Sequence, residues 1–142
     1  MYILNIVPNQ YDMAIHLDKM ASRVNSNLDG MSWQEFEDTI LNALNAERNG
    51  ERVGDKGIDG FTNDGTPIQI KQSERIGRNV IDNFQTALRR YYPSNKKVMK
   101  GIIVAFSFTK GAYEEITRAK DEDNLDVQLI TADELEIKVE NE

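Results

Sequence analysis

A run of five consecutive apolar residues, Ile102–Phe106, constrains the fold of this chain more than any other feature. An apolar run without alternating polar residues is typical of a strand that is buried on both faces. A second buried strand is predicted at Val127–Ile130. Between them, helical spacing predicts a helix that ends near Lys120 and faces inward with Tyr113, Ile116 and Ala119. Because strands joined by helical crossovers lie parallel, we expect an α/β protein with a mixed sheet flanked by helices.

Three more helices are predicted from apolar spacing and capping residues. Residues 10–28 carry apolar side chains at spacings of three and four, which predicts an amphipathic helix that either packs on the core or binds a partner. Ser32 and Glu35 form a capping box that starts the second helix. The third is expected from about Asn79 to Arg90, with Asn79 as its N-cap. Its predicted buried face consists of Val80, Ile81, Phe84, Leu88 and Tyr91.

The stretch Gly54–Ser73 has the composition of a functional site. It follows an expected short strand at Glu51–Val53, and it contains an acid at Asp59 and a turn at Asn63–Gly65. After the turn, a predicted strand alternates apolar and polar residues: Ile68, Gln69, Ile70 and Lys71. We expect the apolar pair to face the core and the polar pair to line the opposite surface. A hairpin here places Asp59 beside the polar pair, and an acid, an amide and a lysine suit a hard divalent cation and its phosphate.

Glu37 falls on the apolar face of the second helix, four residues after Trp33 and four before Leu41. A carboxylate in that position is costly unless it meets a cation or a strong hydrogen-bond donor. One alternative is that Glu37 bends out to water at the helix edge. We favour an inward acid that is directed at a metal centre.

The residues of this stretch resemble the Mrr-like branch of the PD-(D/E)xK nuclease superfamily, in which glutamine replaces the second acid to give the motif D…QxK. Asp59 matches the first position of the motif, and Gln69-Ile70-Lys71 matches the rest. The resemblance covers roughly Ser32 to Leu135 and includes four more segments: Phe36-Glu37, Gly54–Gly60, Gly101–Phe108 and Leu129–Leu135. The runs Ile68–Asn83 and Ile103–Lys120 are also similar to the nuclease-type domain attached to some prokaryotic DNA methyltransferases.

The resemblance implies a restriction-endonuclease-like fold with an α-β-β-β-α-β core and, in this chain, an extra N-terminal helix. Residues 1–31 are then expected to form a helical extension packed on the core. Residues 32–142 are expected to form the nuclease domain.

The resemblance also implies a metal-dependent endonuclease that hydrolyses double-stranded DNA, with a role in restriction-modification or DNA defence. Asp59, Gln69 Oε1 and the Ile70 carbonyl are expected to hold Mg²⁺, for which Mn²⁺ can substitute. Glu37 is expected to bind a second metal or a metal-bound water, and Lys71 to orient or deprotonate the attacking water. The residues expected to contact DNA are Lys56, Gln72, Ser73, Arg75, Arg78 and Asn79.

The charge distribution argues against one class of DNA-binding protein and predicts where a basic surface lies. A net charge of -7 argues against a protein that coats DNA nonspecifically, because phosphate neutralisation needs a basic surface. The basic residues concentrate in the middle of the chain and the acids near its C-terminal end, which predicts a basic working face and an acidic back. The absence of cysteine excludes disulfides and thiolate metal sites and is compatible with the cytoplasm, where we expect the protein. No apolar run is long enough for a membrane span.

Two other function classes stay open at this point. The chain could be a noncatalytic DNA-binding or specificity module that kept the fold, or an interaction domain of a larger DNA methyltransferase that docks through the N-terminal helix. Because one active centre cuts one strand, we expect a nuclease of this kind to act as a homodimer.

Overall fold

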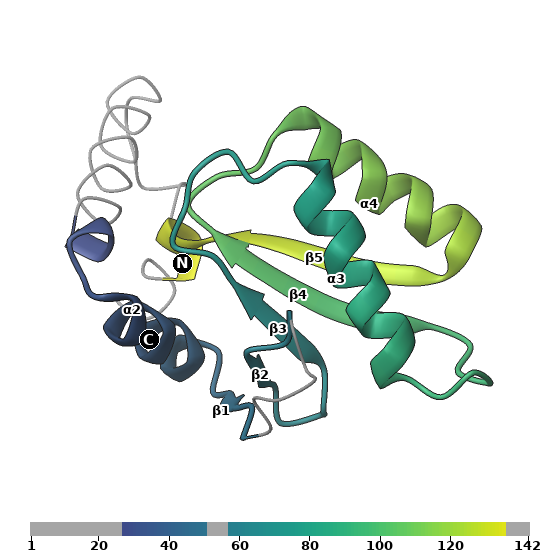
Figure 1. Cartoon of the computed structure of the whole chain (residues 1–142), viewed down its shortest axis with the longest axis horizontal. Coiled ribbons are helices and arrows are strands. Elements are labelled where there is room, and N and C mark those ends of the chain that lie inside the picture. The colour runs from purple at the N-terminus through teal and green to yellow at the C-terminus, as the bar shows by residue number, and fades with distance from the viewer. Residues whose placement is uncertain (1–26, 51–56, 136–142) are drawn as a thin grey trace, which may run out of the picture.

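A computed structural model describes residues 27–50 and 57–135, which fold around a five-stranded sheet of order β1-β2-β3-β4-β5 (Figure 1). The strands are β1 (Glu47–Arg48), β2 (Gly60–Phe61), β3 (Pro67–Ile70), β4 (Met99–Ala105) and β5 (Leu125–Thr131). Strands β1, β2 and β3 pair antiparallel, whereas β3, β4 and β5 pair parallel. The sheet is therefore mixed, as predicted, and the expected hairpin is the pair β2–β3.

The parallel register brings the carboxyl ends of three strands to one edge of the sheet. Ile68 lies opposite Ile102, and Ile70 lies opposite Val104. Consequently β3, β4 and β5 end side by side at residues 70, 105 and 131. This edge is called the carboxyl edge below. The turn of the β2–β3 hairpin and the start of β4 lie at the opposite edge.

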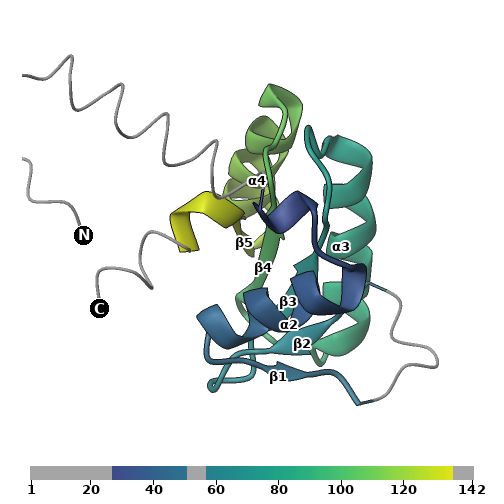
Figure 2. The same ribbon diagram turned by 90° about the vertical axis from the view of Figure 1, so that its left-hand side faces the viewer.

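Helices cover both faces of the sheet (Figure 2). Helix α2 (Trp33–Ala43) lies on one face, and α3 (Arg78–Tyr91) and α4 (Lys110–Asp123) lie on the other. The order α2-β1-β2-β3-α3-β4 is the expected α-β-β-β-α-β core, and α4 and β5 extend it. The restriction-endonuclease-like fold predicted from the sequence is thus confirmed.

Strand alternation divides the apolar side chains between two cores. On the α2 side, Phe36 and Ile40 pack with Ile68, Ile70 and Val104. On the other side, α3 and α4 pack on the intervening positions of β4 and β5, which are Ile103, Leu125 and Val127. A sheet buried on both faces explains why β4 has the continuous apolar run that the sequence shows.

Close approach of α3 to β4 depends on a glycine. A Cβ atom at Gly101 would lie 2.6 Å from Cε2 of Phe84 and 2.9 Å from Cδ1 of Leu88. Both side chains are fully buried and cannot move aside without disturbing the core. Gly101 therefore lets the α3 side chains rest directly on the strand.

The helix starts agree with the sequence in one case and differ in another. Ser32 is the N-cap of α2, and its Oγ accepts a hydrogen bond of 3.2 Å from the backbone N–H of Glu35, as predicted. Helix α3 instead begins at Arg78, with Gly77 as its N-cap and no side-chain cap, so the prediction of Asn79 as N-cap was wrong. The extended backbone of Gly77 starts the helix earlier in the chain than the polar side chain suggested.

Two tyrosines predicted to be buried are exposed. Tyr91 is the last residue of α3 and retains 43% of its accessible surface, and Tyr113 in the first turn of α4 retains 46%. Both rings contact other aromatic rings, Tyr91 that of Phe61 and Tyr113 that of Phe108. Helix α4 also continues to Asp123, past the predicted end near Lys120.

Some predicted elements lie outside the described residues. The N-terminal helix falls there except for its last residues, of which Leu28 packs into the α2-side core. The strand expected at Glu51–Val53 also falls outside. The described strand that precedes β2 and pairs with it is β1, which lies four residues before the expected strand, at Glu47–Arg48.

Candidate active site

Asp59 is fixed at the start of the hairpin, at the carboxyl edge. Its backbone N–H donates to the Ile68 carbonyl at 2.7 Å, and its own carbonyl accepts from the Asn49 N–H at 2.9 Å. Its carboxylate Oδ2 accepts a hydrogen bond of 2.7 Å from the backbone N–H of Ile70. The sequence expectation that a hairpin brings Asp59 to the Gln69-Ile70-Lys71 strand is therefore met in the geometry.

The environment of Asp59 combines burial with positive charge. Burial raises the pKa of this carboxyl, and the Ile70 N–H, the Lys71 ammonium and the Arg48 guanidinium oppose that rise, in that order. Lys71 is half-buried, and its backbone N–H donates to the Val104 carbonyl at 2.8 Å, which fixes it directly after β3. Asp59 and Lys71 thus act on each other electrostatically at one edge of the sheet.

Gln69 is buried on the α3 side of β3, and the expectation that it lines an exposed surface was wrong. Only 6% of its surface is accessible, because α3 covers this face of the sheet as α2 covers the other. A Cβ atom at Gly57 would lie 3.5 Å from Gln69 Nε2 and 3.6 Å from the Cβ of Ala87 in α3. Among the described residues, Gln69 Oε1 has no hydrogen-bond partner. A buried carbonyl oxygen left unpaired costs about 1–3 kcal/mol. Binding of a cation to this oxygen would offset that cost.

Glu37 points inward from α2, as predicted, with 2% of its surface accessible. Its Oε1 is ion-paired with Arg48 of β1, which also pairs with the exposed Asp38. Burial, followed by the charge of Asp59, raises the pKa of Glu37, and Arg48 opposes the rise. Its Oε2 is buried and has no hydrogen-bond partner in the described part of the chain.

Arg48 is the residue of this constellation that sequence reasoning missed. The sequence does contain a hint of this pairing. An acid on the apolar face of a helix requires a cationic partner, and Arg48 lies between that helix and the glycine-rich stretch. The strand containing it has only two residues, Glu47 and Arg48, which is too short for a periodic pattern to be seen. Its pairing with β2 brings the guanidinium to Glu37.

The expected DNA-contact residues that follow β3 occupy one loop at the carboxyl edge. Ser73 and Arg75 are exposed there, and the loop is held by bonds from the Arg75 N–H to Ser107 Oγ at 2.8 Å and from the Phe106 N–H to the Ser73 carbonyl at 3.0 Å. The Gln72 side chain instead makes hydrogen bonds within the protein. Its Nε2 donates at 3.0 Å and 2.8 Å to the carbonyls of Leu28 and Met31.

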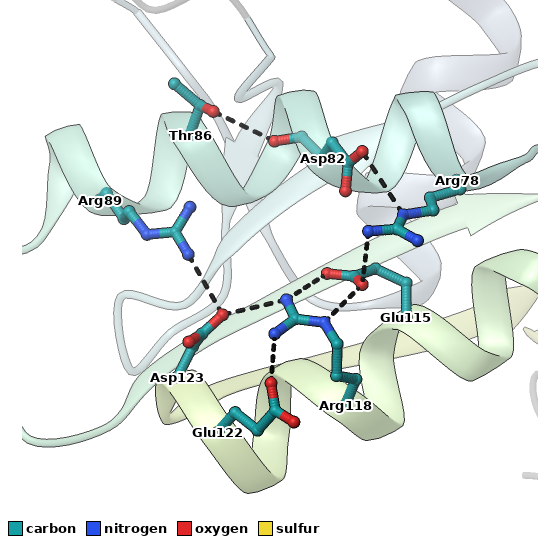
Figure 3. Close-up of polar contacts among 8 residues, drawn as sticks. All are labelled: Arg78, Asp82, Thr86, Arg89, Glu115, Arg118, Glu122 and Asp123. Carbon is teal, nitrogen blue, oxygen red and sulfur yellow. Dashed lines mark hydrogen bonds and ion pairs between the residues drawn. The ribbon is translucent and has the colours of Figure 1, made fainter.

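Arg78 and Asn79 lie in the first turn of α3, and both are exposed. Arg78 is partly engaged within the protein, because it approaches Asp82 at 3.7 Å and the buried Glu115 at 3.4 Å (Figure 3). Lys56, the remaining residue expected to contact DNA, lies outside the described residues.

The oxygen atoms at this edge suit a hard divalent cation, although they do not form a cluster of three acids. In residues 27–50 and 57–135, no three His, Cys, Asp or Glu side chains converge on one point. The candidate donors are the Asp59 carboxylate and two buried unpaired oxygens, Glu37 Oε2 and Gln69 Oε1, which come from opposite faces of the sheet. Carboxylate and amide oxygens are what Mg²⁺ and Mn²⁺ prefer, so the chemistry of these donors suits such an ion.

Comparison with known families gives one family model that spans all of these residues. The model of a restriction endonuclease family, that of the Mrr catalytic domain, matches residues 28–137. A solved structure that is similar to this chain is that of a repair endonuclease from Pyrococcus abyssi, with 18% sequence identity and a TM-score of 0.48. The similarity covers 71% of this chain and 46% of that endonuclease, so the chain spans less than half of its length. Comparison with curated proteins gives no match. Among the described residues, none of the helices has the length and apolar character needed to cross a membrane.

Proposed function

Because this chain belongs to the restriction endonuclease family with an Mrr catalytic domain, as the sequence resemblance predicts, we propose that it is a metal-dependent endonuclease acting on double-stranded DNA. One observation carries the proposal. The Asp59 carboxylate is held against the backbone of Ile70, within electrostatic range of Lys71, at the carboxyl edge of the sheet. This is the arrangement of acid and lysine that phosphodiester hydrolysis needs.

The proposed mechanism assigns a task to each residue. Asp59, Gln69 Oε1 and the Ile70 carbonyl would hold Mg²⁺ or Mn²⁺, which would supply Lewis-acid polarisation of the phosphate. Lys71 orients the attacking water and stabilises the charge that develops on the phosphate oxygens. The water oxygen bonds to phosphorus as the bond to the leaving oxygen breaks. Glu37 contributes its free Oε2 from the α2 side.

Arg48 has a positioning task in this proposal. Its ion pair fixes one oxygen of Glu37, which leaves the other oxygen in a defined direction. Its charge also opposes the rise in the pKa of Glu37 and of Asp59 that burial causes. Arg48 therefore favours the ionised carboxylates that a divalent cation requires.

The direct test is incubation of supercoiled plasmid with the protein and Mg²⁺, Mn²⁺ or EDTA, combined with a gel shift on duplex DNA in EDTA. Nicking that depends on the divalent ion is expected. A shift without nicking at any metal concentration would support a noncatalytic DNA-binding module, and absence of both would leave an interaction domain.

The same proposal extends to the biological role and the assembly of the protein. It includes a role in restriction-modification, an association with a DNA methyltransferase, a cytoplasmic location and a homodimer on DNA. Sedimentation with a duplex should show two chains per cleaved site.

Glu37→Gln should lower the cleavage rate by orders of magnitude and leave the metal-free protein equally or more stable. The amide is cheaper to bury than a carboxylate whose pKa is raised by burial and by Asp59, and Arg48 keeps its pair with Asp38. Added Mg²⁺ should raise the melting temperature of the wild type more than that of the variant. Asp38→Asn is the matched control, since it removes the other partner of Arg48. Equal activity and equal metal-induced shifts in Glu37→Gln and wild type would give Glu37 a structural role only.

Gln69→Glu should retain cleavage and bind Mg²⁺ more tightly. The substitution places a charge where an unpaired Oε1 is now buried, and each added carboxylate strengthens the attraction for a hard cation. Calorimetric titration with Mg²⁺ measures the change. Complete loss of cleavage in a folded variant would mean that the Nε2 hydrogens of Gln69 have a specific role.

A further inference from the structure

A groove of about 950 Å³ lies at the edge of the sheet opposite the candidate active site. It is formed by the turn of the β2–β3 hairpin, the end of α3 and the loop that leads into β4. Its principal side chains are Tyr91, Tyr92, Lys96, Lys97 and Lys100, and we call it the Lys-Tyr groove. None of these residues takes part in the mechanism proposed above.

The groove concentrates positive charge in a chain of net charge -7. In the described part of the chain, none of its three lysines has an acidic partner within 4.0 Å. Among the described residues of its lining, the one acid is Asp64. Its carboxylate is occupied by the turn itself, where it accepts bonds from the Thr66 hydroxyl at 2.9 Å and the Thr66 N–H at 3.3 Å. The lysines are therefore the groups left to meet an anionic ligand.

The two tyrosines of the groove are held in fixed orientations. The Tyr91 hydroxyl donates to the Gly65 carbonyl at 3.2 Å, and the Tyr92 hydroxyl donates to the Lys100 carbonyl at 2.8 Å. Tyr91 packs against Phe61, with 5.2 Å between ring centroids, and the edge of one tyrosine meets the face of the other at 4.9 Å. Tyr91 nevertheless remains 43% exposed, so a rigid aromatic surface faces solvent beside the lysines.

We propose that the Lys-Tyr groove binds an unpaired stretch of DNA, with a base stacked on Tyr91 and phosphates bound by Lys96, Lys97 and Lys100. Fixed aromatic rings next to a basic groove are the combination that binds single strands, because an unpaired base exposes a face that a duplex hides. The choice of DNA as the nucleic acid rests on the proposed endonuclease function.

The position of the groove relates it to the candidate active site. The seven residues of β4 separate the two edges, which corresponds to roughly 20 Å at the rise of a strand. Duplex DNA covers that distance in about six base pairs. A substrate with an unpaired stretch about six base pairs from the cleaved bond would reach both places on one protein molecule.

Binding of a fluorescein-labelled 15-residue oligo-dT, measured by anisotropy in EDTA, tests the lysines. The double variant Lys96→Gln with Lys97→Gln is expected to bind about tenfold more weakly than wild type. The slope of log affinity against log salt should fall by roughly 0.7 for each phosphate contact removed. Lys120→Gln is the control, because Lys120 is an exposed lysine on α4 outside the groove, and it should stay within about twofold of wild type.

Tyr91 is tested by a pair of substitutions. Tyr91→Leu keeps an apolar side chain against Phe61 but removes the aromatic face, and about tenfold weaker binding is expected. Tyr91→Phe should bind like wild type, because the hydroxyl is used by the Gly65 carbonyl and not by the ligand. Melting temperatures of both variants show whether the fold is intact.

Unchanged oligo-dT affinity in both the double lysine variant and Tyr91→Leu would overturn the proposal. Tighter binding of oligo-U than of oligo-dT, or equal binding of a blunt duplex through the same side chains, would also overturn it. Wild type that binds oligo-dT through the groove but leaves plasmid intact at every metal concentration would support the groove and contradict the endonuclease function. Plasmid cleavage without oligo-dT binding would support the endonuclease function and contradict the proposal for the groove.

Discussion

Asp59→Ala should abolish DNA cleavage. The substitution removes the only carboxylate of the D…QxK motif, and Asp59 is the acid that the structure holds against Ile70 beside Lys71. Loss of a residue behind a metal ligand typically costs roughly 10–100-fold, so loss of a ligand itself should cost more. Plasmid cleavage with Mg²⁺ measures the rate, and calorimetric titration measures the expected weakening of divalent binding.

Asp59→Asn separates the chemistry of this residue from its structural bond. An asparagine oxygen can still accept the 2.7 Å hydrogen bond from the Ile70 N–H, which keeps the hairpin in place. Because burial raises the pKa of Asp59, the neutral amide should leave the metal-free protein at least as stable. Asp126→Ala, in β5, is the control and should cleave like wild type. Normal turnover in Asp59→Asn would remove Asp59 from the active site.

Glu115→Gln should lower the free energy of unfolding by weakening a buried ion-pair network between α3 and α4. Glu115 is buried between α3 and α4, where its carboxylate accepts two bonds from Arg118, at 2.8 Å and 2.7 Å, and approaches Arg78 at 3.4 Å (Figure 3). These contacts lower the pKa of Glu115 from 4.5 to about 2. Allowing for solvent screening of the exposed arginines, the loss should be about 2 kcal/mol at pH 7.

The pH dependence of this effect has a defined sign. A carboxyl whose pKa is lower in the folded than in the unfolded protein stabilises the fold above its unfolded value of 4.5. That contribution is lost as the pH falls from 4.5 to about 2, so wild type and Glu115→Gln should converge in acid. Urea unfolding at pH 7 and pH 3 measures it. Glu122→Gln removes an exposed pair of the same arginine and should cost less than about 0.5 kcal/mol. Equal losses in the two variants, or a difference between wild type and Glu115→Gln that is as large at pH 3 as at pH 7, would contradict this account.

The architecture could be predicted because the central strand and the helix that covers it each have a recognisable residue pattern in the sequence. The apolar run of β4 predicted burial on both faces, and Ser32 with Glu35 predicted the start of α2. The inward direction of Glu37 followed from its place between apolar neighbours and was also correct. Patterns of this kind involve residues close in the chain, so they can be recognised without knowledge of the tertiary packing.

The parts that were missed depend on contacts between distant segments. Gln69 was expected at a surface because alternation gives the direction of a side chain but not what covers it, and α3 covers it here. The pairing of Arg48 with Glu37 requires the register of β1 on β2, which no local pattern reveals. Tyr91 matched the helical spacing of buried residues, but as the last residue of α3 it remains exposed and contacts Phe61.

Cleavage by Lys71→Ala decides whether the D…QxK motif is a nuclease centre, because Lys71 is the residue of the motif assigned to the attacking water and the phosphate. Single-turnover cleavage of supercoiled plasmid with Mg²⁺ is compared among wild type, Lys71→Ala and Lys110→Ala, an exposed lysine at the start of α4. Duplex affinity is measured in EDTA for the same proteins. We predict that Lys71→Ala cleaves about 10²–10⁴-fold more slowly than wild type while binding duplex within a few-fold of it, and that Lys110→Ala cleaves normally. Equal cleavage rates in Lys71→Ala and wild type would contradict the account.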